Sequence, residues 1–122
     1  MKNILILEDD KDTSNFYKLL LRHKNYNMQI TETYEQAKKH FNEKINLTII
    51  DLGIPGELSG LDFIKYIKTS PYNQTPIIMI TANLYQKNTP NINADELLIK
   101  PIDNKTFIET IEKHIQREYQ TH

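Results

Sequence analysis

The sequence has no cysteine, no tryptophan and only three glycines among its 122 residues. Without cysteine, the chain cannot form disulfides, thiolate metal sites or a cysteine nucleophile, and a cytoplasmic location is expected. No apolar run approaches the length of a membrane span, and the short run Lys2–Leu7 stops at three acids, unlike a secretory signal. The length fits one domain, residues 1–122, with a hydrophobic core of its own.

The sequence also lacks an excess of positive or negative charge. The formal net charge is -1 and the isoelectric point is near 6.4. A chain with this balance has no general attraction to nucleic acid or to an anionic membrane. We therefore expect neither direct nucleic-acid binding nor membrane insertion.

The chain does contain short apolar runs that alternate with helical patterns. Five runs are typical of strands, and four stretches between or after them have the periodicity of amphipathic helices. The predicted strands are Asn3–Leu7, Asn27–Thr31, Leu47–Asp51, Pro76–Ile80 and Leu97–Ile99, and the predicted helices are Asp12–Lys24, Thr33–Phe41, Gly60–Thr69 and a last one capped by Asp103. Such alternation predicts an α/β fold, a three-layer sandwich in which helices cover both faces of a parallel sheet.

The helical patterns predict which side chains face the sheet. For the first helix we expect a cap at Asp12 or Thr13 and a buried stripe that contains Phe16 and Leu19. The remaining predicted inward residues are Leu20 and His23 in that helix, Ala37 and Phe41 in the second, Leu61, Ile64 and either Ile67 or Tyr66 in the third, and Phe107, Ile108, Ile111, Ile115 and Tyr119 in the last.

One segment interrupts the alternation. A helix is due between Asn83 and Asp95, but the stretch is rich in Asn and Thr and contains Pro90. Pro90 would cost about 3 kcal/mol inside a helix. We therefore expect this helix to be short or irregular, with a rearranging loop in its place.

Polar side chains follow the predicted strands where these end. Glu8, Asp9 and Asp10 follow the first, Asp51 ends the third, and Thr81 and Lys100 follow the fourth and fifth. In the flavodoxin-like strand order 2-1-3-4-5 these groups meet at the carboxyl edge of the sheet, where such folds bind ligands. Taken alone, Asp51 is more simply interpreted as an Asp that only ends a strand and starts a turn.

A cluster of carboxylates favours a bound cation, because like charges a few ångströms apart raise each other's pKa. An all-oxygen site suits Mg²⁺, or Mn²⁺, rather than zinc. With such a cation and Lys100 to offset charge, Asp51 could attack a phosphoryl group. The Thr81 hydroxyl and the backbone N–H groups of Leu52 and Ala82 are the expected hydrogen-bond donors to that group.

These motifs resemble the response-regulator receiver domain of two-component signalling, over essentially the whole length from Lys2 to Tyr119. They are the acid pair Glu8-Asp9, the Asp-x-x-x-Pro of Asp51 to Pro55, Thr81-Ala82 and Lys100-Pro101, in order and each at a strand end. The resemblance implies a CheY-like signalling domain that is not a turnover enzyme, apart from assisting its own phosphorylation and slow dephosphorylation. The chain would be either a stand-alone receiver or the amino-terminal domain of a longer protein.

The resemblance also implies roles for single residues. Asp51 would accept a phosphoryl group from a phosphohistidine on a histidine kinase or histidine phosphotransfer protein, and the result would switch binding to an unknown downstream protein. Thr81 and Lys100 would contact the phosphoryl group, and the Lys100–Pro101 bond would be cis. The implied metal ligands are Glu8 (largely through water), Asp9, Asp51 and the backbone carbonyl of Gly53.

Three features depart from the family pattern. Leu97 stands where an aromatic residue is usual, the turn after Pro55 has one extra residue, and the fourth-helix segment is shorter than usual. Asp10 is a third acid without an assigned family role. Two other classes are possible on the same fold: a cofactor-binding protein or phosphatase, which the three acids and Gly53 disfavour, and a receiver-like interaction module that acts without phosphorylation. The four histidines and the tyrosines are expected to be surface or packing residues.

Overall fold

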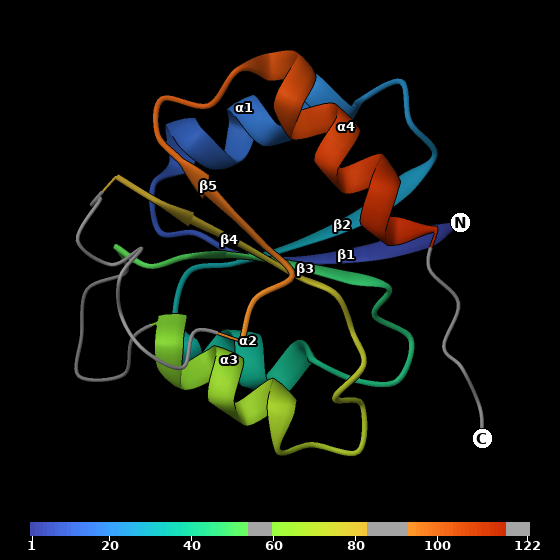
Figure 1. Ribbon diagram of the computed structural model, residues 1–122, viewed down its shortest axis with the longest axis vertical. Helices are drawn as coiled ribbons and strands as arrows, with labels where there is room; N and C mark the ends of the chain where they lie inside the picture. Colours follow the sequence, from blue (N-terminus) through green and yellow to red (C-terminus); the bar gives the residue numbers. More distant parts are fainter. Residues whose placement is uncertain (54–59, 83–92, 117–122) are drawn as a thin grey trace.

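Five parallel strands frame the protein, and Figure 1 shows helices α1 and α4 on one face of the sheet and α2 and α3 on the other. The computed structural model describes residues 1–53, 60–82 and 93–116. Its elements are β1 (Lys2–Leu7), α1 (Lys11–Leu21), β2 (Tyr26–Thr31), α2 (Tyr34–His40), β3 (Leu47–Asp51), α3 (Gly60–Lys68), β4 (Ile77–Thr81), β5 (Glu96–Ile99) and α4 (Asn104–Ile115). The strand order is β2-β1-β3-β4-β5, so the predicted fold class is confirmed.

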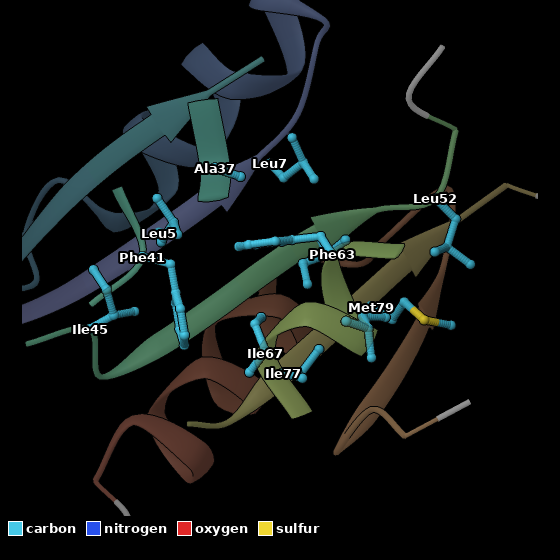
Figure 2. Close-up of a cluster of buried hydrophobic side chains, with 12 residues drawn as sticks. Leu5, Leu7, Ala37, Phe41, Ile45, Leu52, Phe63, Ile67, Ile77 and Met79 are labelled. Carbon is cyan, nitrogen blue, oxygen red and sulfur yellow. The ribbon is translucent and has the colours of Figure 1, made fainter. Parts of the chain in front are cut away.

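The sheet is buried on both faces because its strands are apolar at consecutive positions. Successive side chains point to opposite faces, so Ile6 and Ile49 face α1 and α4, whereas Leu7 and Ile50 face α2 and α3. Two separate cores result. Figure 2 shows the α2/α3 core, in which Phe63 lies among side chains from several strands and packs edge-on against Phe41 with ring centroids 6.0 Å apart.

The helices begin at side chains that cap their first backbone N–H groups. The predicted caps Thr33 and Asp103 are confirmed, because each accepts a hydrogen bond from the backbone N–H three residues later. For α1 the predicted caps were wrong. Asp10 caps this helix, and its side chain accepts from the Thr13 N–H at 2.9 Å.

The predicted buried stripe of α1 was also wrong by one position. Phe16 and Leu19 are 43% and 54% exposed, and His23 is exposed as well, whereas Leu20 packs against the core as predicted. The helix instead buries Ser14, Tyr17 and Leu21. Helix α1 therefore presents apolar side chains to solvent and carries a tyrosine into the core.

Helix α3 begins against the end of β3. A Cβ atom placed on Gly60 would lie 2.8 Å from Ile50 Cγ2 and 2.9 Å from the Asp51 carbonyl oxygen, closer than real contacts allow. Only glycine permits this approach. The helix then buries the predicted Ile64 and Ile67, and Phe63, which the sequence pattern did not single out.

Three predictions concern segments outside the described residues. The altered turn falls on residues 54–59, the irregular helix on residues 83–92, and the predicted inward Tyr119 on residues 117–122. Leu97 itself is described, and it packs against the α2/α3 core. None of the described helices is both long enough and apolar enough to cross a membrane.

Candidate functional site

The register of the strands brings the predicted polar residues to one edge of the sheet. Leu7 pairs with Ile50, Asp51 with Ile80 and Thr81 with Ile99, so the residues after these positions are neighbours. Backbone hydrogen bonds continue past the strands, from the Lys100 N–H to the Thr81 carbonyl at 2.9 Å, for example. The geometry of the sheet therefore fixes where each functional side chain starts.

Asp51 lies at the centre of this edge and is only 6% exposed. Its Oδ1 accepts the Gly53 N–H at 2.7 Å, and its Oδ2 accepts from the Lys100 ammonium, also at 2.7 Å. Burial opposes ionisation, but the neighbouring Glu8 and the hydrogen bonds from Lys100 and Gly53 hold the pKa of the Asp51 carboxyl below its ordinary value. Asp51 is therefore a buried carboxylate that remains ionised.

Glu8 is the second buried acid, at 2% exposure. Burial, and then the neighbouring Asp51 carboxylate, raise the pKa of Glu8 to about 8. Its Oε2 accepts the Asp10 N–H at 3.3 Å, and its Oε1 lies 3.8 Å from the Lys100 nitrogen. Among the described residues no group forms a hydrogen bond with Oε1, although the atom is buried.

A cleft of about 510 Å³ opens over these groups. Asp9 and Ala82 line it from exposed positions, and Thr81 lines it as a buried residue. The full lining within the described chain is Glu8, Asp9, Asp10, Thr13, Asp51, Gly53, Thr81, Ala82 and Lys100. Every residue predicted for the site lines this cleft except Leu52.

Leu52 is placed differently from the other predicted donors. Its backbone N–H donates to the Ile80 carbonyl at 3.0 Å, as part of the sheet. The Gly53 N–H is the backbone donor that reaches Asp51, whereas only the carbonyl of Gly53 was predicted to take part in the site. The only sequence signal for the turn that directs this N–H at the carboxylate is the glycine itself.

Asp10 has a structural role that the family resemblance did not supply. Its Oδ2 accepts hydrogen bonds from both the hydroxyl and the backbone N–H of Thr13, and these hydrogen bonds lower the pKa of Asp10. The Asp10 carboxylate therefore caps and stabilises the first turn of α1. The acid triplet after β1 therefore divides into a buried acid, an exposed acid and a helix cap.

The donor set fits a hard divalent cation. Within the described residues no three acidic or histidine side chains converge closely enough to hold an ion by themselves. Mg²⁺, however, is commonly held by one or two carboxylates and keeps several waters. Glu8 and Asp51 supply two carboxylates, and the buried Glu8 Oε1 lacks the partner that a cation would provide. The Lys100–Pro101 peptide bond is cis, as the resemblance implied.

Comparison with known proteins agrees with this geometry. A family model described as "Response regulator receiver domain" matches residues 4–112. The chain belongs to this family. It is therefore a signalling domain of the kind that two-component systems use, in which histidine kinases supply the phosphoryl group.

Individual relatives of this receiver domain have low sequence identity to it, but the matches extend over nearly the whole chain. It is 32% identical to the response regulator ArlR of Staphylococcus haemolyticus, over 98% of this chain and 55% of ArlR. The chain spans about half the length of the curated relatives it matches. The non-phosphorylated receiver domain of HemR from Leptospira biflexa shares the fold over 100% of both chains, with a TM-score of 0.86 and 22% identity.

A third relative was solved with ligands. It is the response regulator TrrA from Thermotoga maritima in complex with Mg²⁺ and BeF, 29% identical to this chain with a TM-score of 0.81. The match covers 93% of this receiver domain and 98% of TrrA.

Proposed function

We propose that this receiver domain accepts a phosphoryl group on Asp51 from a phosphohistidine of a partner kinase or phosphotransfer protein, in a reaction that depends on a divalent cation. The observation that carries the proposal is the state of Asp51. It is buried, ionised and 2.7 Å from the Lys100 ammonium at the base of an acidic cleft.

The chemistry follows from that placement. A carboxylate oxygen of Asp51 attacks phosphorus, the P–N bond of the phosphohistidine breaks, and its electron pair stays on the imidazole nitrogen. The product is an acyl phosphate on Asp51. Phosphoryl transfer of this kind depends on positioning and on compensation of charge more than on covalent catalysis by the protein.

The remaining residues of the site position the incoming group. The Lys100 ammonium moves from Asp51 Oδ2 to a phosphoryl oxygen, which keeps its charge next to the anion. The Thr81 hydroxyl and the backbone N–H groups of Ala82 and Leu52 are the proposed donors to the other oxygens. For Leu52 this requires that its N–H leave the Ile80 carbonyl, so Gly53 is the better-placed backbone donor.

The proposed cation ligands are Glu8, Asp9, Asp51 and the Gly53 carbonyl. A bound Mg²⁺ would offset the negative charges of the acceptor and the phosphoryl group. TrrA, with its Mg²⁺ and BeF, supports this assignment by similarity. Mn²⁺ has the same preference for oxygen ligands and is the alternative cation.

The consequence of phosphorylation is a change in partner binding, and the acyl phosphate is lost slowly without a partner. The downstream protein is unassigned. Residues 83–92, where we expect the readout, lie outside the described part of the chain.

Asp51→Asn tests the proposal directly. The amide has the shape of the carboxylate but is not a nucleophile, so labelling by an acyl phosphodonor with Mg²⁺ should disappear while the circular dichroism spectrum is kept. Intact-mass spectrometry measures the label. Asp12→Asn is the matched control, since Asp12 is an exposed acid in α1, and it should label normally.

Two results would contradict the proposal. Labelling that persists in Asp51→Asn would place the phosphoryl group on another residue. A wild-type protein that takes no label from the phosphodonor or from a phosphorylated kinase would favour the alternative, an interaction module that acts without phosphorylation.

A further inference from the structure

Strand β2 forms one edge of the sheet, and within the described chain no other strand pairs with its outer side. The Thr31 carbonyl accepts the Glu8 N–H at 2.9 Å, so it points toward β1. In a strand the backbone groups of alternate residues point to the same side, and those of the residues between them point to the other side. The N–H and carbonyl groups of Met28 and Ile30 therefore point outward from the sheet.

The two edges of the sheet differ in protection. Strand β5, at the other edge, has only four residues, begins with the charged Glu96 and is followed by Lys100 and Pro101. Short length, charge and proline are features by which natural sheets prevent pairing at an edge. Strand β2 has six residues, with neither a charged residue nor a proline among them. It is therefore the edge at which a further strand can add.

The surroundings of β2 leave room for such a strand. Asn27 and Gln29 are exposed, and they line a cleft of about 280 Å³ that extends to His40 at the end of α2. On the opposite face Met28 and Ile30 are only partly buried against the core under α1 and α4. An added strand would thus meet amide groups on one face and apolar side chains on the other.

The charges at the two ends of β2 are opposite in sign. Arg22 and Lys24 precede the strand, and Glu32 and Glu35 follow it. A second copy that pairs antiparallel brings the basic end of one strand to the acidic end of the other, whereas a parallel copy would bring like charges together. Lys24 contacts Glu112 of its own chain at 3.2 Å, but its ammonium has three donors and can serve two carboxylates.

One antiparallel register matches both the charges and the side chains. When Met28 lies opposite Met28 of the second copy, Tyr26 lies opposite Ile30 and Lys24 opposite Glu32. Pairs of an aromatic with a β-branched residue, and pairs of opposite charge, stabilise antiparallel strands. In this register the outward backbone groups of the two Met28 residues bond each other, and each Ile30 N–H reaches a Tyr26 carbonyl. The Tyr26 N–H keeps its bond to the Lys24 carbonyl of its own chain, at 2.9 Å.

We propose that β2 is a self-association surface, at which two copies of this domain pair antiparallel about Met28 and join their sheets into one. The occupant is a second copy because the strand and its flanking charges are complementary to themselves in that register. None of the paired residues lines the cleft over Asp51. The inference therefore does not depend on phosphorylation.

Sedimentation velocity over a range of protein concentrations tests the pairing. Wild type should form a dimer as the concentration rises. Glu32→Lys should weaken the dimer about tenfold, because two symmetry-related pairs with Lys24 change from attraction to repulsion. Adding Lys24→Glu to Glu32→Lys exchanges the two charges and should restore most of the affinity.

Glu109→Lys is the matched control, since it makes the same change of charge on the exposed face of α4. It should leave the dimer unchanged, and circular dichroism confirms that each variant is folded. Wild type that stays monomeric up to millimolar concentration would overturn the proposal. So would a Glu32→Lys protein that behaves like Glu109→Lys, or a double variant that associates no better than Glu32→Lys.

Cross-linking tests the register independently, because the chain has no cysteine of its own. In the proposed register Met28→Cys brings two Cα atoms to about 5.5 Å, within the range of a disulfide. Gln29→Cys is the control: two copies of this position would be diagonal neighbours about 7–8 Å apart, too far for a relaxed disulfide.

Under mild oxidation Met28→Cys should become a disulfide-linked dimer on a non-reducing gel, and Gln29→Cys should stay largely monomeric. Cross-linking of Gln29→Cys that equals or exceeds that of Met28→Cys would overturn the register. A folded Met28→Cys protein that forms no cross-link would overturn the pairing itself.

Discussion

At the scale of single residues, Lys100 is the cation that the site already contains. Its nitrogen lies 2.7 Å from Asp51 Oδ2 and 3.8 Å from Glu8 Oε1. Burial opposes its charge, but the hydrogen bond and the charge of Asp51, and then the charge of Glu8, hold the pKa of Lys100 above its ordinary value. A divalent cation at the proposed site would therefore compete with the ammonium for the same two carboxyl groups.

Lys100→Met should separate these two roles. Methionine keeps most of the length of the chain but has no charge, so Mg²⁺ should bind more tightly once its competitor is gone. Labelling by a phosphodonor should nevertheless slow, because the variant lacks the ammonium group that would stabilise the negative charge of the phosphoryl oxygens. Mg²⁺ titration and the rate of the intact-mass shift measure the two effects.

Lys105→Met is the control for this prediction, since Lys105 is an exposed lysine of α4 away from the cleft. It should change neither quantity. Mg²⁺ binding that weakens in Lys100→Met would show that the lysine supports the cation rather than competing with it.

The site residues could be predicted from sequence to the extent that strand ends specify positions. Asp51 and Lys100 meet as expected because each directly follows an apolar run whose register the sheet fixes. The burial of Glu8 and of Tyr17 could not be predicted, because it depends on how α1 is rotated against the sheet. Phe16 and Leu19 are as apolar as the residues that the helix buries, and the polar Ser14 makes the buried face hard to recognise from the sequence.

At the scale of elements, Asp10 ties the loop of the site to helix α1. Its side chain caps the helix, and its backbone N–H donates to Glu8 Oε2 at 3.3 Å. The same residue therefore orders the first turn and holds a buried acid of the site.

Asp10→Ala and Asp10→Asn should differ in stability. Alanine removes the cap and should lower the melting temperature, whereas asparagine also caps helices well and should remain close to wild type. Thermal unfolding followed by circular dichroism compares the two. If both variants melt together below wild type, the charge of Asp10 rather than its capping oxygen provides the stability.

Helix α4 is held to β5 by a polar contact at the other end of the sheet. His114 is buried, and its Nε2 lies 3.0 Å from Glu96 Oε1, which also accepts from Lys113 at 3.3 Å. Because an ionised carboxylate only accepts, His114 donates through Nε2. These contacts, His114 first, lower the pKa of Glu96.

The contribution of Glu96 to stability should depend on pH. A carboxyl whose folded-state pKa is lowered stabilises the protein above its unfolded pKa, about 4.3 for Glu, and loses this effect as the pH falls through the folded value. Glu96→Gln should therefore cost about 0.5 kcal/mol at neutral pH, a typical value for a solvent-screened pair. The difference from wild type should shrink once the pH falls below the unfolded pKa and vanish below the lowered pKa of Glu96.

Urea unfolding of both proteins at several pH values measures this difference. Glu109→Gln, on the exposed face of α4, is the control and should show a smaller effect at every pH. A destabilisation by Glu96→Gln that persists unchanged into acid would mean that packing, not charge, is lost.

At the scale of the whole molecule, the fold could be predicted almost completely and its exceptions have local causes. Five apolar runs that alternate with helical patterns leave few arrangements once right-handed crossovers are required. The errors lie in the phase and cap of α1, where Asp10, Asp12 and Thr13 are all acceptable caps and tertiary contacts choose among them.

Cation binding should stabilise the whole molecule. A ligand that binds only the folded state adds RT ln(1 + [L]/Kd), about 1.4 kcal/mol at ten times Kd. The melting temperature should therefore rise with Mg²⁺ in wild type and much less in Asp9→Asn, which loses one proposed ligand. A melting temperature indifferent to millimolar Mg²⁺ would contradict the proposed cation site.

Gly53 and Gly60, on either side of residues 54–59, both contact the proposed phosphoacceptor. The Gly53 N–H donates to Asp51 Oδ1, and Gly60 abuts the Asp51 carbonyl. Residues inserted between them would lengthen a connection whose two ends are already held, and the entropic cost of such lengthening grows only slowly. A peptide reporter inserted there would have both of its ends anchored beside Asp51, so this position suits a sensor of phosphorylation.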